Sequence, residues 1–387
     1  MKNTLVVISK DKLIATDTVA PIIREFKEKT GGKVYFYVPH RHAIDFLKEN
    51  FILYDAICEV SDIRVISYGG KFKRKFIYIS TLLYWLFLLV NGAKFIHFGM
   101  LDIWPFNFLS FIKSNNIYYM QNDTFSTSIE KVEALVFGMG DTKALLYEDF
   151  STSRRIYCKN IIVSDSNNYI LKNPKNKGKN IFILRGTRIR KSWLEFIDNK
   201  YSLFNNYHNG VDFSRGVIVY ALTTFASLET LRNKNTTKQL FLETMHILDN
   251  MKLDIPVIIK PHPVTQMDEV NNILDKMESN NFYISYLHPT FLSLKAKIWL
   301  CNVYSTTCAD AYCMGVTTIE YTDYSDTCLQ ALSGKSFGDQ YIDHFIQNDS
   351  DLLNSTIIKS MNKDDKIKNL RCTPIDSNDI VGALSSI

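Results

Sequence analysis

The sequence lacks the short motifs that mark several common enzyme classes. Its 387 residues contain no Walker loop and no Gly-x-Gly-x-x-Gly fingerprint, which argues against a dinucleotide-dependent oxidoreductase. No apolar run reaches the roughly 20 residues of a membrane-spanning helix. The first apolar run, Leu5 to Ser9, is too short for a signal peptide. Hydrophobic residues make up 46% of the chain and charged residues 22%, as in an ordinary globular protein.

Paired cysteines and a strong charge bias are also missing. The seven cysteines are scattered without any Cys-x-x-Cys spacing, and we predict free thiols in a reducing cytosol. The expected location is therefore cytoplasmic. A net charge of +5 favours an anionic ligand or an anionic membrane surface, but it is too small to indicate nucleic-acid binding.

The length of the chain predicts two domains, because a single core rarely grows this large. Strand and helix patterns alternate throughout, which predicts α/β domains with doubly wound parallel sheets. The polar, turn-rich stretch from Asn205 to Gly210 is the expected linker. We therefore expect two Rossmann-like domains, residues 1–209 and 210–387, facing a central cleft. The last helices are expected to pack back on the first domain.

The pattern of apolar residues predicts the individual elements. Helices are expected at 19–29, 43–50, 129–137, 237–251, 268–277 and 305–314, and from 339 onward. Strands are expected at 5–9, 33–38, 56–60, 94–98, 116–120, 144–147, 161–165, 180–184, 217–222, 256–260, 282–286, 298–303 and 318–321.

Residues 71–90 combine a basic start with a long apolar run. Residues 71–75 read Lys-Phe-Lys-Arg-Lys, and the fifteen residues from Phe76 to Val90 are almost wholly apolar. One interpretation is a buried helix of the first domain. The other is an interfacial helix whose basic residues lie against anionic lipid. The second would make the protein peripheral at the inner face of the plasma membrane.

The first candidate site is Lys260-Pro261-His262-Pro263, which directly follows an apolar strand. Ligands of open parallel sheets collect at the carboxyl ends of strands. The two prolines stiffen the loop. His262 could therefore donate a hydrogen bond to a phosphate oxygen or protonate it as it leaves. The alternative is a loop histidine that only caps a turn.

The second candidate site is the start of the helix at 305–314. Ser305, Thr306 and Thr307 open this helix with three consecutive hydroxyls, which together with free backbone N–H groups favour an anion. A plain N-cap needs only one of them. Asp310, one turn further on, could accept hydrogen bonds from a ribose, or it could simply face solvent.

Carboxylates supply the remaining candidates. Glu148 and Asp149 end a predicted strand of the first domain, where one could be a general base; the alternative is a polar turn. Glu229, in the loop after the first strand of the second domain, could be a nucleophile, or a charge favoured by the helix dipole. The cluster Arg185, Arg188 and Arg190 could neutralise an anionic substrate, or form a solvated face.

These motifs, taken in order, resemble those of the bacterial CMP-sugar transferases of GT-B fold. That group includes the sialyltransferases, polysialyltransferases and Kdo transferases of capsule and lipopolysaccharide synthesis. Its pattern is an acidic pair followed by Gly, then His-Pro, then a Ser-rich helix start. Here the matching positions are Glu148-Asp149-Phe150, His262-Pro263 and Ser305-Thr306-Thr307. The resemblance implies a GT-B fold over the whole chain.

The resemblance also implies roles for particular residues. Inverting members use the second acid of the pair as the base, which would be Asp149. Retaining Kdo transferases use a carboxylate of the second domain, for which Glu229 is the candidate. Phe150 stands where the family has Gly, so this loop lacks the same backbone freedom. Lys260 to Pro263 and the later Thr318-Ile319-Glu320-Tyr321 are also similar to capsule and glycerol-phosphate polymerases, which use CDP-linked donors.

The function expected on this basis is transfer of a nonulosonic acid, of the sialic acid or Kdo type, from its CMP conjugate. The acceptor would be a bacterial surface glycan or glycolipid: lipopolysaccharide, O-antigen or capsule. Lys260, His262, Pro263, Ser305, Thr306, Thr307 and Asp310 would bind the donor, with no cofactor and no metal. Two alternatives remain: a transferase with a CDP-glycerol or UDP-sugar donor, and a non-catalytic member of a polysaccharide-assembly complex.

Overall fold

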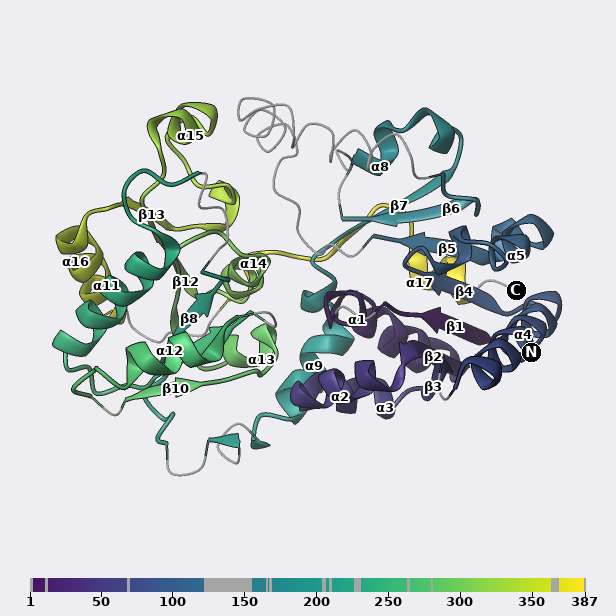
Figure 1. Ribbon diagram of the computed structural model, residues 1–387, viewed down its shortest axis with the longest axis horizontal. Coiled ribbons are helices and arrows are strands. Elements are labelled where there is room, and N and C mark those ends of the chain that lie inside the picture. Colours follow the sequence, from purple (N-terminus) through teal and green to yellow (C-terminus); the bar gives the residue numbers. More distant parts are fainter. Residues whose placement is uncertain are drawn as a thin grey trace. The chain divides into compact units, whose positions relative to one another are not determined.

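The computed structural model shows two compact α/β units (Figure 1). It describes residues 3–10, 13–67, 70–121, 155–164, 166, 169–203, 207–208, 211–225, 231–262, 265–279, 281–362 and 369–385. Among these residues, the first unit holds everything up to Phe196 and the segment that starts at Pro374. The second unit holds Ile197–Thr373.

The first unit is built on a mostly parallel sheet with the order β14-β7-β6-β5-β4-β1-β2-β3. Its parallel strands are β1 Thr4–Ile8, β2 Lys33–His40, β3 Asp62–Ser67, β4 Lys94–His97, β5 Ile117–Met120, β6 Asn160–Val163 and β7 Asn180–Arg185. The edge strand β14, Ile375–Asp376, pairs antiparallel with β7. The central strands β1, β5 and β6 are buried along their whole length, and β4 is buried except at Lys94, which explains why these strands are mostly apolar.

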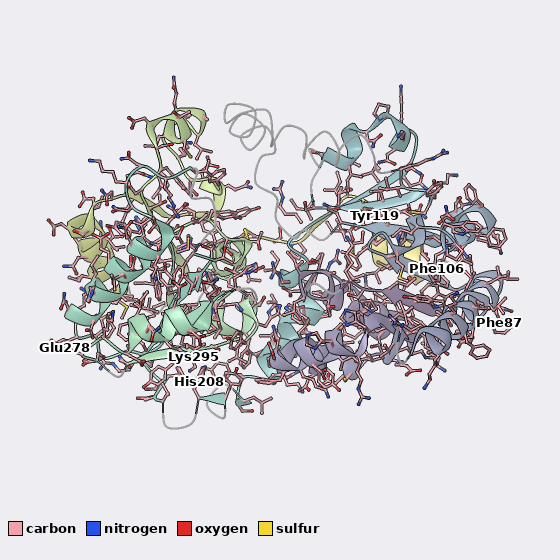
Figure 2. All side chains as sticks on the ribbon, viewed as in Figure 1. Phe87, Phe106, Tyr119, His208, Glu278 and Lys295 are labelled. Carbon is pink, nitrogen blue, oxygen red and sulfur yellow. A yellow bond between two sulfur atoms is a disulfide. The ribbon has the colours of Figure 1, made fainter. Side chains whose placement is uncertain are left out.

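Helices follow most strands of this sheet. The α-helices are α1 Leu13–Thr30, α2 Arg41–Glu49, α3 Phe51–Cys58, α4 Lys71–Val90, α5 Asn107–Ile112, α8 Tyr169–Lys172, α9 Lys191–Asn199 and α17 Ile380–Ser385. Short 3-10 turns lie at Met100–Asp102, Ser114–Asn116, Pro174–Asn176 and Thr187–Ile189. One core cluster joins the sheet to α4 and α5 through Trp85, Phe95, Phe106 and Tyr119. Figure 2 labels Phe106 and Tyr119, which both lie inside this unit.

The second unit is built on a parallel sheet with the order β10-β9-β8-β11-β12-β13. Its strands are β8 Val217–Leu222, β9 Val257–Pro261, β10 Phe282–Ile284, β11 Ala296–Cys301, β12 Thr317–Thr322 and β13 His344–Gln347. Its helices are α11 Thr237–Asn250, α12 Met267–Leu274, α13 Pro289–Ser293, α14 Thr306–Cys313, α15 Asp326–Ala331 and α16 Ser350–Met361, with a 3-10 turn at Asp339–Tyr341. Helix α11 begins with a capping box formed by Thr236 and Gln239.

The predicted fold class is confirmed, since both units are α/β domains with parallel, Rossmann-like sheets. The predicted strand at 56–60 is wrong: α3 occupies Phe51–Cys58, and the third strand is Asp62–Ser67. The region after Asp339 is not purely helical, because β13 precedes α16 there. The predicted elements at 129–137 and 144–147 lie outside the described residues.

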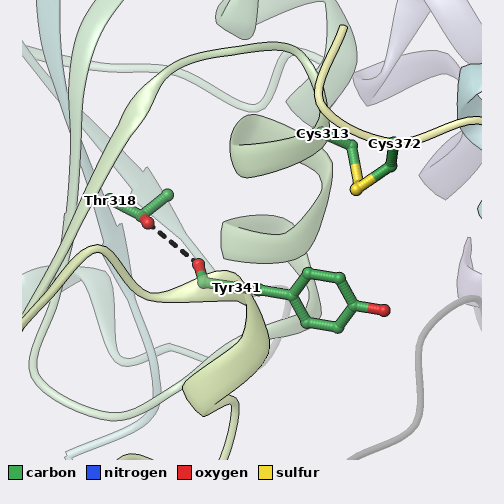
Figure 3. Close-up of a disulfide and its surroundings, with 4 residues drawn as sticks. All are labelled: Cys313, Thr318, Tyr341 and Cys372. Atoms are coloured by element: carbon green, nitrogen blue, oxygen red, sulfur yellow. Dashed lines mark hydrogen bonds between the residues drawn. A yellow bond between two sulfur atoms is a disulfide. The ribbon is translucent and has the colours of Figure 1, made fainter.

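Two cysteines form a disulfide, so the prediction of free thiols is wrong for this pair. Cys313, at the end of α14, is bonded to Cys372, 59 residues later. Figure 3 shows the bond beside the turn that holds Tyr341, whose carbonyl accepts a hydrogen bond from Thr318 Oγ1 at 2.9 Å. The adjacent Arg371 donates to both carboxylate oxygens of Asp343, at 2.8 and 2.9 Å. The segment around residue 372 is therefore fixed to the second unit.

Candidate functional site

The second sheet offers a site at the carboxyl ends of its strands. All six strands are parallel, so their carboxyl ends meet at one edge. The strand order runs outward from β8 on one side and from β11 on the other, which makes the β8–β11 boundary the topological switch point. Ligands of open α/β sheets bind in the crevice at such a point.

Lys260 and His262 lie at this edge, at the end of β9. Lys260 is half-buried and pairs in register with Ala221 of β8. His262 directly follows the strand, and its side chain is exposed. Its carbonyl accepts a hydrogen bond from Thr265 N at 2.9 Å. His262 is thus an exposed residue at the carboxyl edge of the sheet. Pro263 lies outside the described residues.

The predicted helix start lies at the same edge, after β11. Ser305 is the N-cap of α14, and its Oγ accepts from Thr307 N at 3.4 Å. Its hydroxyl also lies 3.0 Å from Thr307 Oγ1. Ser305, Thr306 and Thr307 are all half-buried, so part of each residue remains accessible. One hydroxyl therefore caps the helix, and the group as a whole forms a polar opening of the kind that binds anions.

The two groups are not next to each other. β9 and β11 both flank β8, so His262 and Ser305 follow strands that are separated by one strand. Two strand spacings correspond to roughly 10 Å. The loop after β8, described as far as Phe225, lies between them in the strand order. A ligand that contacts both groups must therefore extend across the end of β8.

Asp310 is placed differently from either sequence interpretation. Its residue is fully buried within α14, so it does not face solvent. A fully buried carboxylate does not reach a ligand in this conformation either. We therefore do not place it among the groups that contact a donor.

A buried polar network supports this edge, and the sequence interpretation missed its role. Glu320, on β12, accepts from Tyr304 N at 3.2 Å, from Tyr324 Oη at 2.6 Å and from Ser336 Oγ. Burial raises the pKa of the Glu320 carboxyl, although its hydrogen bonds and the nearby Arg232 oppose the rise. The bond to Tyr304 N fixes the loop that leads into α14.

Arg232 and Asn302 extend the network to the neighbouring strands. Arg232 donates to Asn302 O at 3.1 Å and to Thr322 Oγ1, at the ends of β11 and β12. Asn302 donates to Tyr321 O at 2.7 Å and accepts from Tyr220 Oη on β8. These contacts hold the ends of β8, β11 and β12 in register. The available signal was a single Glu within the otherwise uncharged strand 317–322.

Two of the three arginines in the cluster, Arg188 and Arg190, have structural roles. Arg188 is 2% exposed, and its Nη1 lies 2.7 Å from Asp17 Oδ2. Arg190 contacts Glu25 at 2.6 Å and Asp376 at 2.9 Å. Neither the solvated face nor the substrate-neutralising role therefore holds for these two residues, because their charges are already paired inside the first unit.

The proposed carboxylates Glu148, Asp149 and Glu229 lie outside the described residues. The chain also contains one Asp-x-Asp, Asp349-Ser350-Asp351, and Asp349 caps α16 by accepting from Leu352 N at 2.9 Å. Within the described part of the chain, no group of His, Cys, Asp or Glu side chains is arranged to hold a metal ion.

Comparison with known proteins identifies the fold. No protein-family model matches the sequence, and no curated protein matches it. Among solved structures, it is similar to a UDP-glucose:anthocyanidin 3-O-glucosyltransferase in complex with UDP, with a TM-score of 0.50 and 9% identity over 93% of this chain and 94% of that one. A UDP-N-acetylglucosamine 2-epimerase gives a TM-score of 0.50 and 11% identity over 99% and 89% of the two chains.

A third similar structure is that of Arabidopsis thaliana UGT89C1, with a TM-score of 0.50 and 9% identity over 93% of this chain and 90% of that one. At these identities the likeness concerns the fold alone. The two doubly wound units are those of the GT-B fold, which confirms the expected architecture of the domains.

Proposed function

We propose that this protein is a glycosyltransferase that uses a nucleotide-linked donor. The observation that carries the proposal is the carboxyl edge of the second sheet. There an exposed histidine, a lysine and a hydroxyl-rich helix start stand on both sides of the topological switch point. Such groups suit a phosphate, because cations and helix N-termini both favour negative charge. The GT-B fold of the units is consistent with this reaction class.

The proposed donor is the CMP conjugate of a nonulosonic acid, and the proposed acceptor is a bacterial surface glycan. The support is the ordered set of acidic pair, His262-Pro263 and Ser305-Thr306-Thr307 in the sequence. In this reaction the leaving group is a single phosphate. His262 would donate a hydrogen bond or a proton to it, and the start of α14 would stabilise its charge. Lys260 would neutralise the donor carboxylate.

A UDP-sugar donor is the second candidate, because two of the similar structures are described with UDP or a UDP-sugar in their names. A CDP-glycerol donor is a further alternative, and the same binding experiment tests it. Binding of CMP, CDP and UDP, compared by the rise in melting temperature, separates these donors. A rise with CMP alone favours the nonulosonic acid, and a rise only with UDP favours the second candidate.

The carboxylate that acts on the sugar decides the stereochemistry. Asp149 as a general base would give inversion, and Glu229 as a nucleophile would give retention through a covalent intermediate. Anomeric NMR of the product distinguishes the two outcomes. A sugar trapped covalently on Glu229 would identify the retaining mechanism directly.

His262→Ala tests the proposed phosphate contact. We expect turnover to fall by about 100-fold or more, in the range of a lost general acid. The melting-temperature shift produced by CMP should also shrink. His246→Ala is the matched control, because His246 is an exposed histidine on α11 of the same unit. Folded protein that binds none of the three nucleotides would contradict the proposal and favour a non-catalytic role.

A further inference from the structure

Helix α4 of the first unit has two apolar faces. Ile77, Trp85, Leu88 and Leu89 face the core and are at most 9% exposed. A second set is between 50% and 73% exposed: Phe76, Ile79, Leu83, Phe87 and Val90. At about 100° per residue, this second set falls within an arc of roughly 80°. Figure 2 shows Phe87 at the outer margin of the unit. The helix therefore buries one apolar face and leaves another uncovered.

The neighbouring segment adds more exposed apolar side chains. Ile103, Trp104, Phe108 and Phe111 are between 49% and 79% exposed. Phe106 ties this segment to α4, with ring centroids 6.0 Å from Tyr78 and 5.4 Å from Trp85. We call the exposed apolar residues of α4 and of residues 103–111 the α4–α5 surface. Apolar clusters of this kind mark sites of contact with another phase or molecule.

The charge around this surface is of one sign. Residues 70–116 contain six Lys or Arg and one Asp, so they account for the whole net charge of +5. The rest of the chain has 39 residues of each sign. Lys73, Arg74 and Lys75 are exposed at the start of α4, where the helix dipole disfavours positive charge. The one acid, Asp102, accepts from Tyr157 N at 3.1 Å.

The positive charge of the α4–α5 surface favours an anionic bilayer over a second copy of the chain as its partner. A second copy of the chain, related by a two-fold axis, would bring the basic surface against itself. An anionic bilayer instead attracts the basic residues while it receives the apolar ones, which is the arrangement of interfacial helices. Among the described residues, no helix has the length and hydropathy needed to cross a membrane.

We propose that the α4–α5 surface docks on an anionic lipid bilayer, with α4 lying in the plane of the interface. Aromatic side chains such as Trp104 and Phe111 enter the headgroup region, and Lys73, Arg74 and Lys75 contact lipid phosphates. The interpretation of α4 as a buried helix holds for only one of its faces, because the other is exposed. The inference rests on this surface alone and does not depend on the proposed reaction.

Flotation of the full-length protein with vesicles tests the inference. We expect binding to vesicles of phosphatidylcholine with phosphatidylglycerol, and much weaker binding to phosphatidylcholine alone. Each basic residue at such a surface contributes a factor of about five in partitioning. Lys73→Glu/Arg74→Glu/Lys75→Glu should therefore reduce binding by on the order of 100-fold. Leu83→Ser/Phe87→Ser should reduce it by about 10-fold or more.

Matched controls alter the same chemistry elsewhere. Leu352→Ser/Ile358→Ser changes two side chains of α16 that are each 48% exposed. Lys48→Glu/Lys177→Glu/Lys359→Glu makes the same change in net charge at exposed positions. Both should bind vesicles like the unaltered chain, and all variants should keep its melting temperature. Equal loss in controls and test variants would overturn the inference. So would a stable dimer without lipid that Leu83→Ser/Phe87→Ser dissociates.

Discussion

At the scale of single residues, Glu320 shows how the second unit tolerates a buried charge. A buried carboxyl is costly unless donors surround it. Here the donors are Tyr304 N, Tyr324 Oη and Ser336 Oγ, with Arg232 nearby. Tyr304 and Tyr324 belong to the loops after β11 and β12, and Ser336 follows α15. The carboxyl therefore fastens these loops to the sheet at the place where the candidate site lies.

Glu320→Gln should change how stability depends on pH. Burial raises the folded-state pKa of this carboxyl above its unfolded value. Its contribution is therefore fully present below about pH 4.5 and is lost as the pH rises through the raised pKa. Gln does not titrate, so the variant should lack this decline. Hydrogen exchange of β11 and β12, followed from about pH 5 to pH 8, measures the difference.

Ser336→Ala is the informative comparison for Glu320→Gln. It keeps the titrating carboxyl but removes one hydrogen bond that opposes the rise in pKa. We expect the decline in stability to be larger and to continue to a higher pH than in the unaltered chain, because the folded-state pKa rises further while the unfolded value is unchanged. If Glu320→Gln retained the full decline, another group would have to be responsible for it.

At the scale of elements, the start of α14 combines a structural task with the proposed binding task. Ser305 caps the helix through Thr307 N, whereas no hydrogen bond of the Thr306 side chain is seen among the described residues. Ser305→Ala should therefore lower the free energy of unfolding by about 1 kcal/mol. Denaturant titration of the unliganded protein measures this effect.

Thr306→Ala separates the two tasks. Its effect on the unliganded protein should stay within about 0.5 kcal/mol, as for substitutions away from a cap. If the hydroxyls hold a phosphate, this variant should nevertheless show a smaller melting-temperature shift with CMP. A normal shift in Thr306→Ala would limit the role of this residue to the helix.

Most strands could be predicted from the sequence because buried parallel strands are continuous apolar runs, as in Val217–Leu222. The prediction of a strand at 56–60 was wrong, because the helix α3 occupies Phe51–Cys58. The apolar residues of this stretch fit neither the helical period of 3.6 nor the strand period of 2 clearly, and such a run can form either element. Strand β13 was missed because it is short and mostly half-buried. The local pattern of apolar residues therefore predicts an element correctly only where either the helical or the strand period dominates.

The candidate site was predictable only in part, for a related reason. Lys260, His262 and the hydroxyls at 305–307 stand at strand and helix ends, which local sequence indicates well. Arg232 and Glu320 are 88 residues apart in sequence, and nothing local shows that they share one network. The same holds for the Cys313–Cys372 bond. Long-range pairings need the fold before they can be recognised.

At the scale of the whole molecule, the chain enters the second unit near Ile197 and returns to the first at Pro374. The returning segment completes the first unit, because β14 extends its sheet and α17 adds Ile380, Val381 and Leu384 to its buried residues. Two parts of the sequence that are far apart thus share one core. The stability of the first unit should therefore depend on residues that follow the second.

Deletion of residues 374–387 should weaken the first unit selectively. It removes the pairing of β14 with β7, the bond from Tyr118 Oη to Ala383 O and the Asp376 partner of Arg190. Arg190 keeps Glu25 as a partner at 2.6 Å, so the main loss is the strand pairing and the buried side chains of α17. Hydrogen exchange should rise in α1 and β7 but stay unchanged in β8, β9 and β11. Asp376→Asn should give a smaller rise in the same elements. Equal rises in both sheets would contradict the division, because each sheet has a core of its own.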